Sequence, residues 1–331
     1  MKRRTPISVA IGAIIAAAGL VAAPIAQAQP ASPVESNTPV LHQAATTKSE
    51  QRRVSNYWTA ERMRSAQQLN VRPDSGWHPS KVETGEPEVQ KGYPGKKKKP
   101  SADGSYLGGP WTGGGAVVQT TGKVFFTLDG VDYVCSGSVT PASNKSTVST
   151  AGHCVNEGPG DYATNFAFVP GYDDGDAPYG TWTASTLTTS EQWRTQGDFN
   201  YDIGFAIVAP LDGQSLADVV GSQSIGFNQP RGDFLYSFGY PQAAPYDGST
   251  LDYCSDTATD DVIGGSDDQR LDCNMTGGSS GGPWFDGFNA TAGTGVQVSV
   301  NSFGYQGEKN AMYGPYFGTV IEDVYNSLQG D

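Results

Sequence analysis

The sequence predicts an all-β fold for residues 101–331. Three observations favour this class. The chain has 43 glycines in 331 residues, short apolar runs bounded by Gly, Asn and Asp recur along this part, and helical periodicity is found there only at the end. A length of 331 residues is enough for one large domain or two small ones.

The expected elements follow one another along the chain. Residues 124–128 and 131–135 flank Asp129-Gly130, a two-residue turn typical of a β-hairpin. Apolar runs between turn residues predict further strands at residues 148–150, 165–169, 181–183, 203–208, 234–238 and 295–300. A C-terminal helix is expected because five apolar residues recur at helical spacing: Val320, Ile321, Val324, Tyr325 and Leu328.

Residues 1–28 have the pattern of a signal peptide. A basic start at residues 2–4 precedes an apolar stretch at residues 7–25, and Ala26-Gln27-Ala28 matches a cleavage site. A membrane anchor is the alternative, but Gly and Pro interrupt the apolar stretch and the cleavage pattern follows at once. Since no later segment holds 18 consecutive apolar residues, we expect a secreted protein with no membrane association in its mature form.

Residues 29–100 are expected to be a prosegment, followed by a domain at residues 101–331. The stretch 29–50 is polar and rich in Pro, Ser and Thr, which predicts disorder, whereas residues 50–70 have helical character. Four lysines at residues 96–99 precede Pro100. This run is either a solvated linker or an exposed processing site.

Charge changes sign at the same boundary. Residues 1–100 hold 15 Lys and Arg against 7 Asp and Glu, a net charge of +8, and residues 101–331 hold 6 against 27, a net charge of −21. The acidic part argues against nucleic acid or an anionic membrane as a partner. The basic part could dock on the acidic part as an intramolecular inhibitor, or the two could be independently soluble pieces.

The four cysteines predict two disulfides, since an even number in an exported protein is typical of disulfide pairing. Three pairings are possible. Pairing neighbours in sequence would join Cys135 to Cys154 and Cys254 to Cys273, each closing a modest loop. No C-x-x-C or H-x-x-x-H pattern is present, so a zinc site is not expected, and nothing in the sequence calls for a cofactor. The acidic turn at residues 172–176 could bind calcium, but it lacks the spacing of an EF-hand loop, and a solvated turn is the alternative.

Three short segments supply the members of a nucleophilic site. His153 lies in Thr-Ala-Gly-His-Cys and is the only histidine after His78. Asp202 directly precedes an apolar strand, where a partly buried carboxylate could orient the imidazole. Asp198 is the nearby competitor, but no apolar strand follows it directly.

Ser280 lies in a glycine run, Gly277–Gly282. A flexible linker is the alternative, but Pro-Trp-Phe follows the run directly. A serine needs a neighbouring base to become nucleophilic, and glycines let backbone N–H groups approach an oxyanion. The N–H groups of Gly278 and Ser280 are therefore the candidate oxyanion hole.

In order and context, T-A-G-H-C, D-I-G and G-x-S-G-G-P resemble the chymotrypsin-fold serine peptidases, over roughly residues 115–330. The resemblance implies two six-stranded antiparallel β-barrels with the site between them. By position, His153 would be the general base, Asp202 its orienting group and Ser280 the nucleophile. Segments 169–172 and 178–182 are similar to the secreted bacterial branch that includes glutamyl endopeptidases.

Two positions depart from the trypsin-like pattern. Ser279 stands where those enzymes carry the Asp that pairs with a new N-terminal ammonium, so activation should not use that ion pair. Asn274 stands at the base of the primary specificity pocket and offers no full charge for Arg or Lys. Ser302 and Gly304 would form the pocket wall. Residues 101–331 hold no second histidine of the kind that glutamyl endopeptidases use, so the residue preferred before the scissile bond stays open.

Together these features predict a secreted, monomeric serine endopeptidase that cuts proteins or peptides and is made as a preproprotein. One alternative is a binding or adhesion protein that keeps the protease fold without turnover. Another is an esterase that uses the same site.

Overall fold

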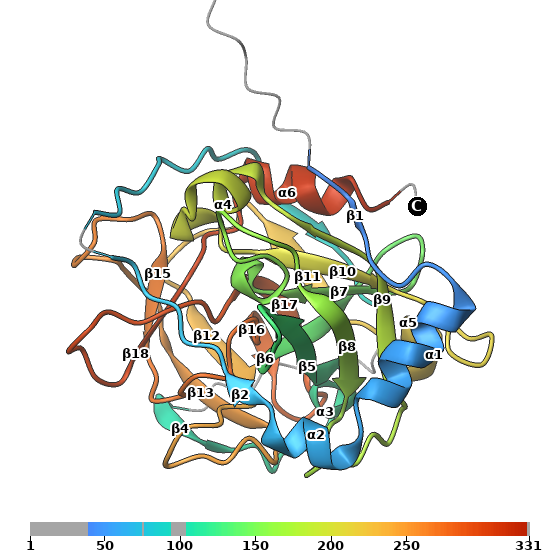
Figure 1. The fold of residues 1–331 in the computed structure, drawn as a ribbon. Helices are drawn as coiled ribbons and strands as arrows, with labels where there is room; N and C mark the ends of the chain where they lie inside the picture. The colour runs from blue at the N-terminus through green and yellow to red at the C-terminus, as the bar shows by residue number, and fades with distance from the viewer. Residues whose placement is uncertain (1–38, 75, 94–103, 330–331) are drawn as a thin grey trace, which may run out of the picture. The chain divides into compact units, whose positions relative to one another are not determined.

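The computed structural model describes residues 39–74, 76–93 and 104–329. The predicted signal peptide and the lysine run at residues 96–99 lie outside these ranges. Strands dominate the described chain (Figure 1), and none of its helices is long and apolar enough to span a membrane. The all-β prediction is confirmed, as is the C-terminal helix, α6 (Thr319–Asn326).

Six antiparallel strands close into a first barrel. Their order around it is β5, β6, β7, β10, β9 and β8, and β8 pairs with both β5 and β9 to complete the circle. The predicted hairpin turn is present, with positive φ at Asp129 and Gly130. The strand bounds are β5 (Thr121–Leu128), β6 (Val131–Thr140), β7 (Thr147–Thr150), β8 (Thr164–Pro170), β9 (Trp182–Thr189) and β10 (Gly204–Val208).

The second half of the chain forms two further sheets. Seven strands pair in the order β3, β11, β17, β16, β12, β13 and β4, and three more in the order β14, β15 and β18. Their bounds are β3 (Glu88–Gln90), β4 (Tyr106–Pro110), β11 (Ser224–Phe227), β12 (Phe234–Gly239), β13 (Asp252–Thr257), β14 (Thr259–Asp260), β15 (Gln269–Asp272), β16 (Pro283–Asn289), β17 (Thr294–Val300) and β18 (Ala311–Gly314).

Short helical turns connect the strands of both halves. The 3₁₀ turn η1 (Gly152–Cys154) follows β7 and carries His153. A second 3₁₀ turn, η2 (Phe199–Tyr201), precedes β10, and Asp202 directly follows it. The short α-helices are α3 (Ala116–Thr120), α4 (Glu191–Gln196) and α5 (Leu216–Val220).

The described residues 39–93, here called the N-terminal segment, add strands to both halves. β1 (His42–Gln43) pairs with β9, β2 (Gln67–Gln68) pairs in parallel with β6, and β3 pairs with β11. Figure 1 shows the segment in blue and cyan, with α1 (Lys48–Tyr57) and α2 (Ala60–Ser65) between β1 and β2. The described residues belong to one compact unit.

The structure corrects two expectations for this segment. The disorder predicted for residues 29–50 is wrong for residues 39–50, because the edge of β9 pairs with β1 and Thr47 caps α1 through a capping box with Glu50. The helical stretch predicted at residues 50–70 is two short helices, and Thr59 caps the second. Composition did not reveal this order, since it comes from contacts with the barrels.

Candidate active site

η1 and the turn after η2 bring His153 and Asp202 together. Nδ1 of His153 lies 2.7 Å from Oδ2 of Asp202, and the His153 backbone N–H donates to Asp202 Oδ1 at 2.8 Å. Both side chains are buried, with 1% and 0% of their surface exposed. Two bonds to one carboxylate fix both the ring and its backbone, which suits a carboxylate that orients an imidazole.

The competing Asp198 faces elsewhere. Its carboxylate caps η2 at Asn200 and accepts the backbone N–H of Ser80 at 2.9 Å. Of the two carboxylates, only Asp202 bonds to His153 in the described chain.

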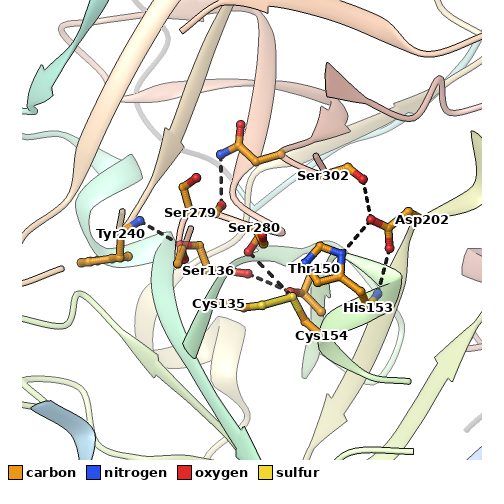
Figure 2. The surroundings of a disulfide bond; sticks show 12 residues. Cys135, Ser136, Thr150, His153, Cys154, Asp202, Tyr240, Ser279, Ser280 and Ser302 are labelled. Atoms are coloured by element: carbon orange, nitrogen blue, oxygen red, sulfur yellow. Dashed lines mark hydrogen bonds and ion pairs between the residues drawn. A yellow bond between two sulfur atoms is a disulfide. The ribbon is translucent and has the colours of Figure 1, made fainter. Parts of the chain in front are cut away.

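A third donor reaches Asp202. The hydroxyl of Ser302, which follows β17, donates to Asp202 Oδ2 (Figure 2). The resemblance suggested Ser302 only as pocket wall. Ser302 also lines the cleft beside Ser280, so it lies between that cleft and the His153–Asp202 pair.

The loop carrying Ser280 is tied to the first barrel by Ser136. The Ser136 N–H donates to Ser280 O at 2.7 Å, and its hydroxyl donates to Gly278 O at 2.9 Å. The N–H of Tyr240 donates to that hydroxyl at 2.8 Å. Sequence reasoning missed Ser136, although its position next to Cys135 in a strand was a usable signal.

Glycine is needed at two places in this loop. Gly278 has φ of +98° and Gly281 has φ of +79°, in the region that side chains rarely adopt. A Cβ on Gly281 would also lie 2.5 Å from Ser136 O. The backbone can therefore turn tightly around Ser280, as a loop that points amide groups at an oxyanion requires.

The His153 ring lies between Asp202 and Ser280 in the view of Figure 2. Its Nε2 is buried and has no hydrogen-bond partner among the described residues, whereas Nδ1 is bound to Asp202. Catalytic hydrogen bonds are often long before substrate binds. The free nitrogen is the one that would accept a proton from a nucleophile.

The prediction of two disulfides is confirmed, and of the three possible pairings the structure has Cys135–Cys154 and Cys254–Cys273. The first joins β6 to the turn that carries His153. The sulfur atoms of Cys135 and Cys154 lie near His153, but because they are bonded to each other they supply no thiolate for a metal.

A cleft of about 480 Å³ opens beside Ser280, and its lining includes the three predicted pocket residues, Asn274, Ser302 and Gly304. Asn274 Oδ1 accepts the hydroxyl of Tyr246. The Asn274 backbone N–H donates to Leu107 O at 2.9 Å, so strand β4 supports the base of the pocket.

The N-terminal segment runs through this cleft. Leu69 and Val71 line it beside Ser280, and they also line a second cavity of about 180 Å³ beside His153. Side chains of Gln68 and Asn70 fill the space next to Gly277, where a Cβ would collide with them. The segment thus covers the site, and only 7% of the surface of Ser280 is exposed.

Comparisons with solved structures identify relatives. The protease Anisep from Arthrobacter nicotinovorans is 54% identical, with a TM-score of 0.62 over 65% of this chain and 98% of that protein. The thermostable serine protease AL20 from an extremophilic microorganism is 45% identical, with a TM-score of 0.62 over 65% of this chain and 99% of its own. The predicted double-barrel fold is confirmed by these matches.

More distant matches add less. A Glu endopeptidase structure is 18% identical with a TM-score of 0.53, over 69% of this chain and 98% of that one, which supports the fold alone. A curated relative, the extracellular metalloprotease of Bacillus subtilis (strain 168), is 35% identical over 72 residues. That match spans only 22% of either protein, so its printed activity is not carried over. No family model matches the chain.

Proposed function

Because the chain belongs to the chymotrypsin-fold serine proteases, we propose that it is a secreted serine endopeptidase with Ser280 as its nucleophile. It would be made with a signal peptide at residues 1–28 and a prosegment at residues 29–100, ahead of a monomeric peptidase domain at residues 101–331. The observation that carries the proposal is the buried His153–Asp202 pair, which is held by two hydrogen bonds next to the cleft that Ser280 lines.

The proposed chemistry is acyl transfer. Ser280 Oγ attacks the peptide carbonyl carbon and its proton passes to His153 Nε2, the nitrogen left free by Asp202. The N–H groups of Gly278 and Ser280 hold the oxyanion. The proton then goes to the leaving amine, and an acyl-enzyme remains on Ser280. Water, deprotonated by His153, attacks the ester, and the acid leaves as Ser280 regains its proton.

Two features of the site bear on activation and specificity. Ser279 donates its hydroxyl to Thr276 O and carries no charge, so activation through an ion pair with a new N-terminus is not part of the proposal. Asn274, bonded to Tyr246, gives the pocket a neutral polar base. Substrates are proposed to be proteins or peptides.

We also propose that the N-terminal segment keeps the precursor inactive. Its residues 69–72 line the cleft, and peptide substrate could not enter while they remain there. Secretion is supported by the two disulfides, which suit an oxidising compartment.

The test is Ser280→Ala in the processed protein. We expect digestion of casein to stop and labelling by a fluorophosphonate to disappear, whereas Ser279→Ala should keep the label on the peptide that contains Ser280. Cutting by Ser280→Ala at the parental rate would overturn the proposal. A parent protein that takes no label would be an inactive binding protein, and one that takes the label but cuts only esters would be an esterase.

A further inference from the structure

A buried lysine lies beside the site without a role in the proposed chemistry. Lys123 on β5 is 1% exposed, and its ammonium donates to Gln242 Oε1 at 2.9 Å and to Gly248 O at 2.8 Å. The ammonium also lies 4.9 Å from the centre of the Tyr172 ring. Burial lowers the pKa of Lys123 to about 8. Burying an ammonium costs free energy unless hydrogen bonds compensate for lost water, so the position of Lys123 Nζ depends on these two acceptors.

Lys123 determines which way the Gln242 amide points. An ammonium only donates hydrogen bonds, so the amide must turn its oxygen toward Lys123 and its NH₂ group away from it. That NH₂ group, Nε2, donates to the backbone carbonyl of Ala66 at 2.6 Å. The lysine therefore holds Gln242 as an oriented N–H donor facing the N-terminal segment.

Gln242 is also adjacent to the candidate oxyanion loop. Its backbone N–H donates to Gly277 O at 2.8 Å, and its Cβ would lie 3.2 Å from a Cβ placed on Gly278. Gly277 and the neighbouring Ala243 both line the cleft beside Ser280, so Gln242 lies next to that cleft.

The contact with Ala66 indicates which side this is. Residues 69–72 of the N-terminal segment line the cleft together with Asn274, the predicted base of the pocket for the residue before the scissile bond. Ala66 lies three residues before this stretch, on the side away from Arg72, and directly precedes β2, which pairs with Tyr133 and Val134 of β6. That end of the cleft would hold residues after the scissile bond.

We propose that Gln242, oriented by Lys123, is a substrate-binding residue that donates Nε2 to a main-chain carbonyl on the leaving-group side of the scissile bond. In the precursor the carbonyl of Ala66 occupies this donor. The inference rests on the proposed peptidase function and adds to it a binding site for extended peptides, independent of their side chains.

The test compares two substrates on the processed enzyme. Both carry the same acyl half, but one is a p-nitroanilide with no peptide carbonyl after the scissile bond and the other continues for four residues. Gln242→Glu keeps the shape and the Lys123 contact and replaces the donor by an acceptor. We expect kcat/KM for the extended peptide to fall roughly tenfold or more, through KM, with the p-nitroanilide changed less than about twofold. Lys123→Met should act in the same direction.

Controls separate this inference from simpler causes. Gln214→Glu, at an exposed glutamine, adds the same charge elsewhere and should leave both substrates unchanged. An equal loss on both substrates, or no loss on either, would overturn the proposed contact. Fluorophosphonate titration of each variant counts the active enzyme. If even the parent protein takes no label, the proposed peptidase function is wrong, rather than the role of Gln242.

A binding measurement tests the donor without catalysis. A synthetic peptide of residues 62–72 should bind processed Ser280→Ala protein, and adding Gln242→Glu should weaken its Kd roughly tenfold in calorimetry. Equal affinity for the two proteins would contradict the role of Gln242 even if the enzyme were inactive.

Discussion

Asp202 is held by hydrogen bonds that its sequence motif does not reveal. Its carboxylate accepts from the His153 backbone, the His153 ring and the Ser302 hydroxyl. The motif and the strand that follows favoured Asp202, but the third donor comes from a residue 100 positions later, and nothing in the sequence pairs the two. Gln242 and Lys123 are 119 positions apart, and their contact was equally invisible.

Ser302→Ala should therefore impair turnover more than binding. Removing the hydroxyl leaves the buried carboxylate with one donor fewer, and a hydrogen bond to a charged group contributes about 1.5–3 kcal/mol, so we expect kcat to fall roughly tenfold to a hundredfold with little change in KM. Steady-state kinetics on the processed enzyme measure this. Ser299→Ala is the matched control, because Ser299 is a buried serine on β17, three residues before Ser302, that donates to Pro315 O instead. A similar kcat for both variants would contradict the role of Ser302.

Asp252 gives a prediction for stability against pH. Burial, with a smaller contribution from Asp247, raises the pKa of this carboxyl to about 6. As pH rises from about 4 to 6, the unfolded chain loses this proton before the folded one does, so the folded state loses stability and the deficit persists at neutral pH. Asp252→Asn should raise the melting temperature at pH 7 and leave it unchanged below pH 4. The exposed Asp212→Asn should change neither, and a gain for Asp252→Asn that is equal at both pH values would exclude this explanation.

At the scale of elements, sequence patterns found the strands with strong local signals and missed those defined by distant partners. The hairpin at residues 124–135 was predictable because its turn is encoded in Asp129-Gly130. β1, β2 and β3 have two or three residues each, too few for any periodicity, and exist because the edges of β9, β6 and β11 pair with them. The family resemblance predicted the pocket residues. It did not predict that Tyr246 and β4 support Asn274.

The two disulfides offer a matched comparison of elements. Both join residues that are 19 positions apart. Removing either one frees the unfolded chain by a similar amount and should lower the free energy of unfolding by about 3 kcal/mol. Their positions differ, since one holds the η1 turn with His153 and the other precedes Asn274. Replacing Cys135 and Cys154 by alanine should lower mainly kcat, and replacing Cys254 and Cys273 should raise mainly KM. Denaturant unfolding with steady-state kinetics measures both, and identical kinetic changes would contradict this division.

At the scale of the whole molecule, the N-terminal segment is attached far more widely than a charged tail would be. Trp58 is 3% exposed and donates Nε1 to Asn165 O at 2.6 Å, and Met63 and Val82 are also buried. Ser80 and Val82 donate backbone N–H groups to Asp198 and Asp267. Of the ion pairs that α2 makes with the barrel side, Arg64–Asp174 is exposed and Arg62–Asp132 is only partly buried, so each contributes little. Backbone pairing and apolar burial therefore dominate the described contacts of the segment. The sequence had suggested instead that the segment docks through its opposite charge.

This arrangement predicts that cutting the chain after the N-terminal segment is not enough for activity. If residues 96–99 are replaced by the recognition sequence of a specific protease and cut, residues 39–93 should stay bound through three strand pairings and the Trp58 contact. The cut protein should elute as one species in gel filtration at both about 0.05 and about 0.5 M NaCl. The higher concentration screens surface charges that still interact at the lower one. Fluorophosphonate labelling of Ser280 should then remain slow until the fragment is removed.

Trp58→Ala loses a buried aromatic worth about 3–5 kcal/mol in comparable sites, so the same cut should release the fragment and speed labelling at least tenfold. Full labelling of the unsubstituted protein at the rate of the cut would show instead that the covalent link, rather than the docked strands, keeps the cleft closed.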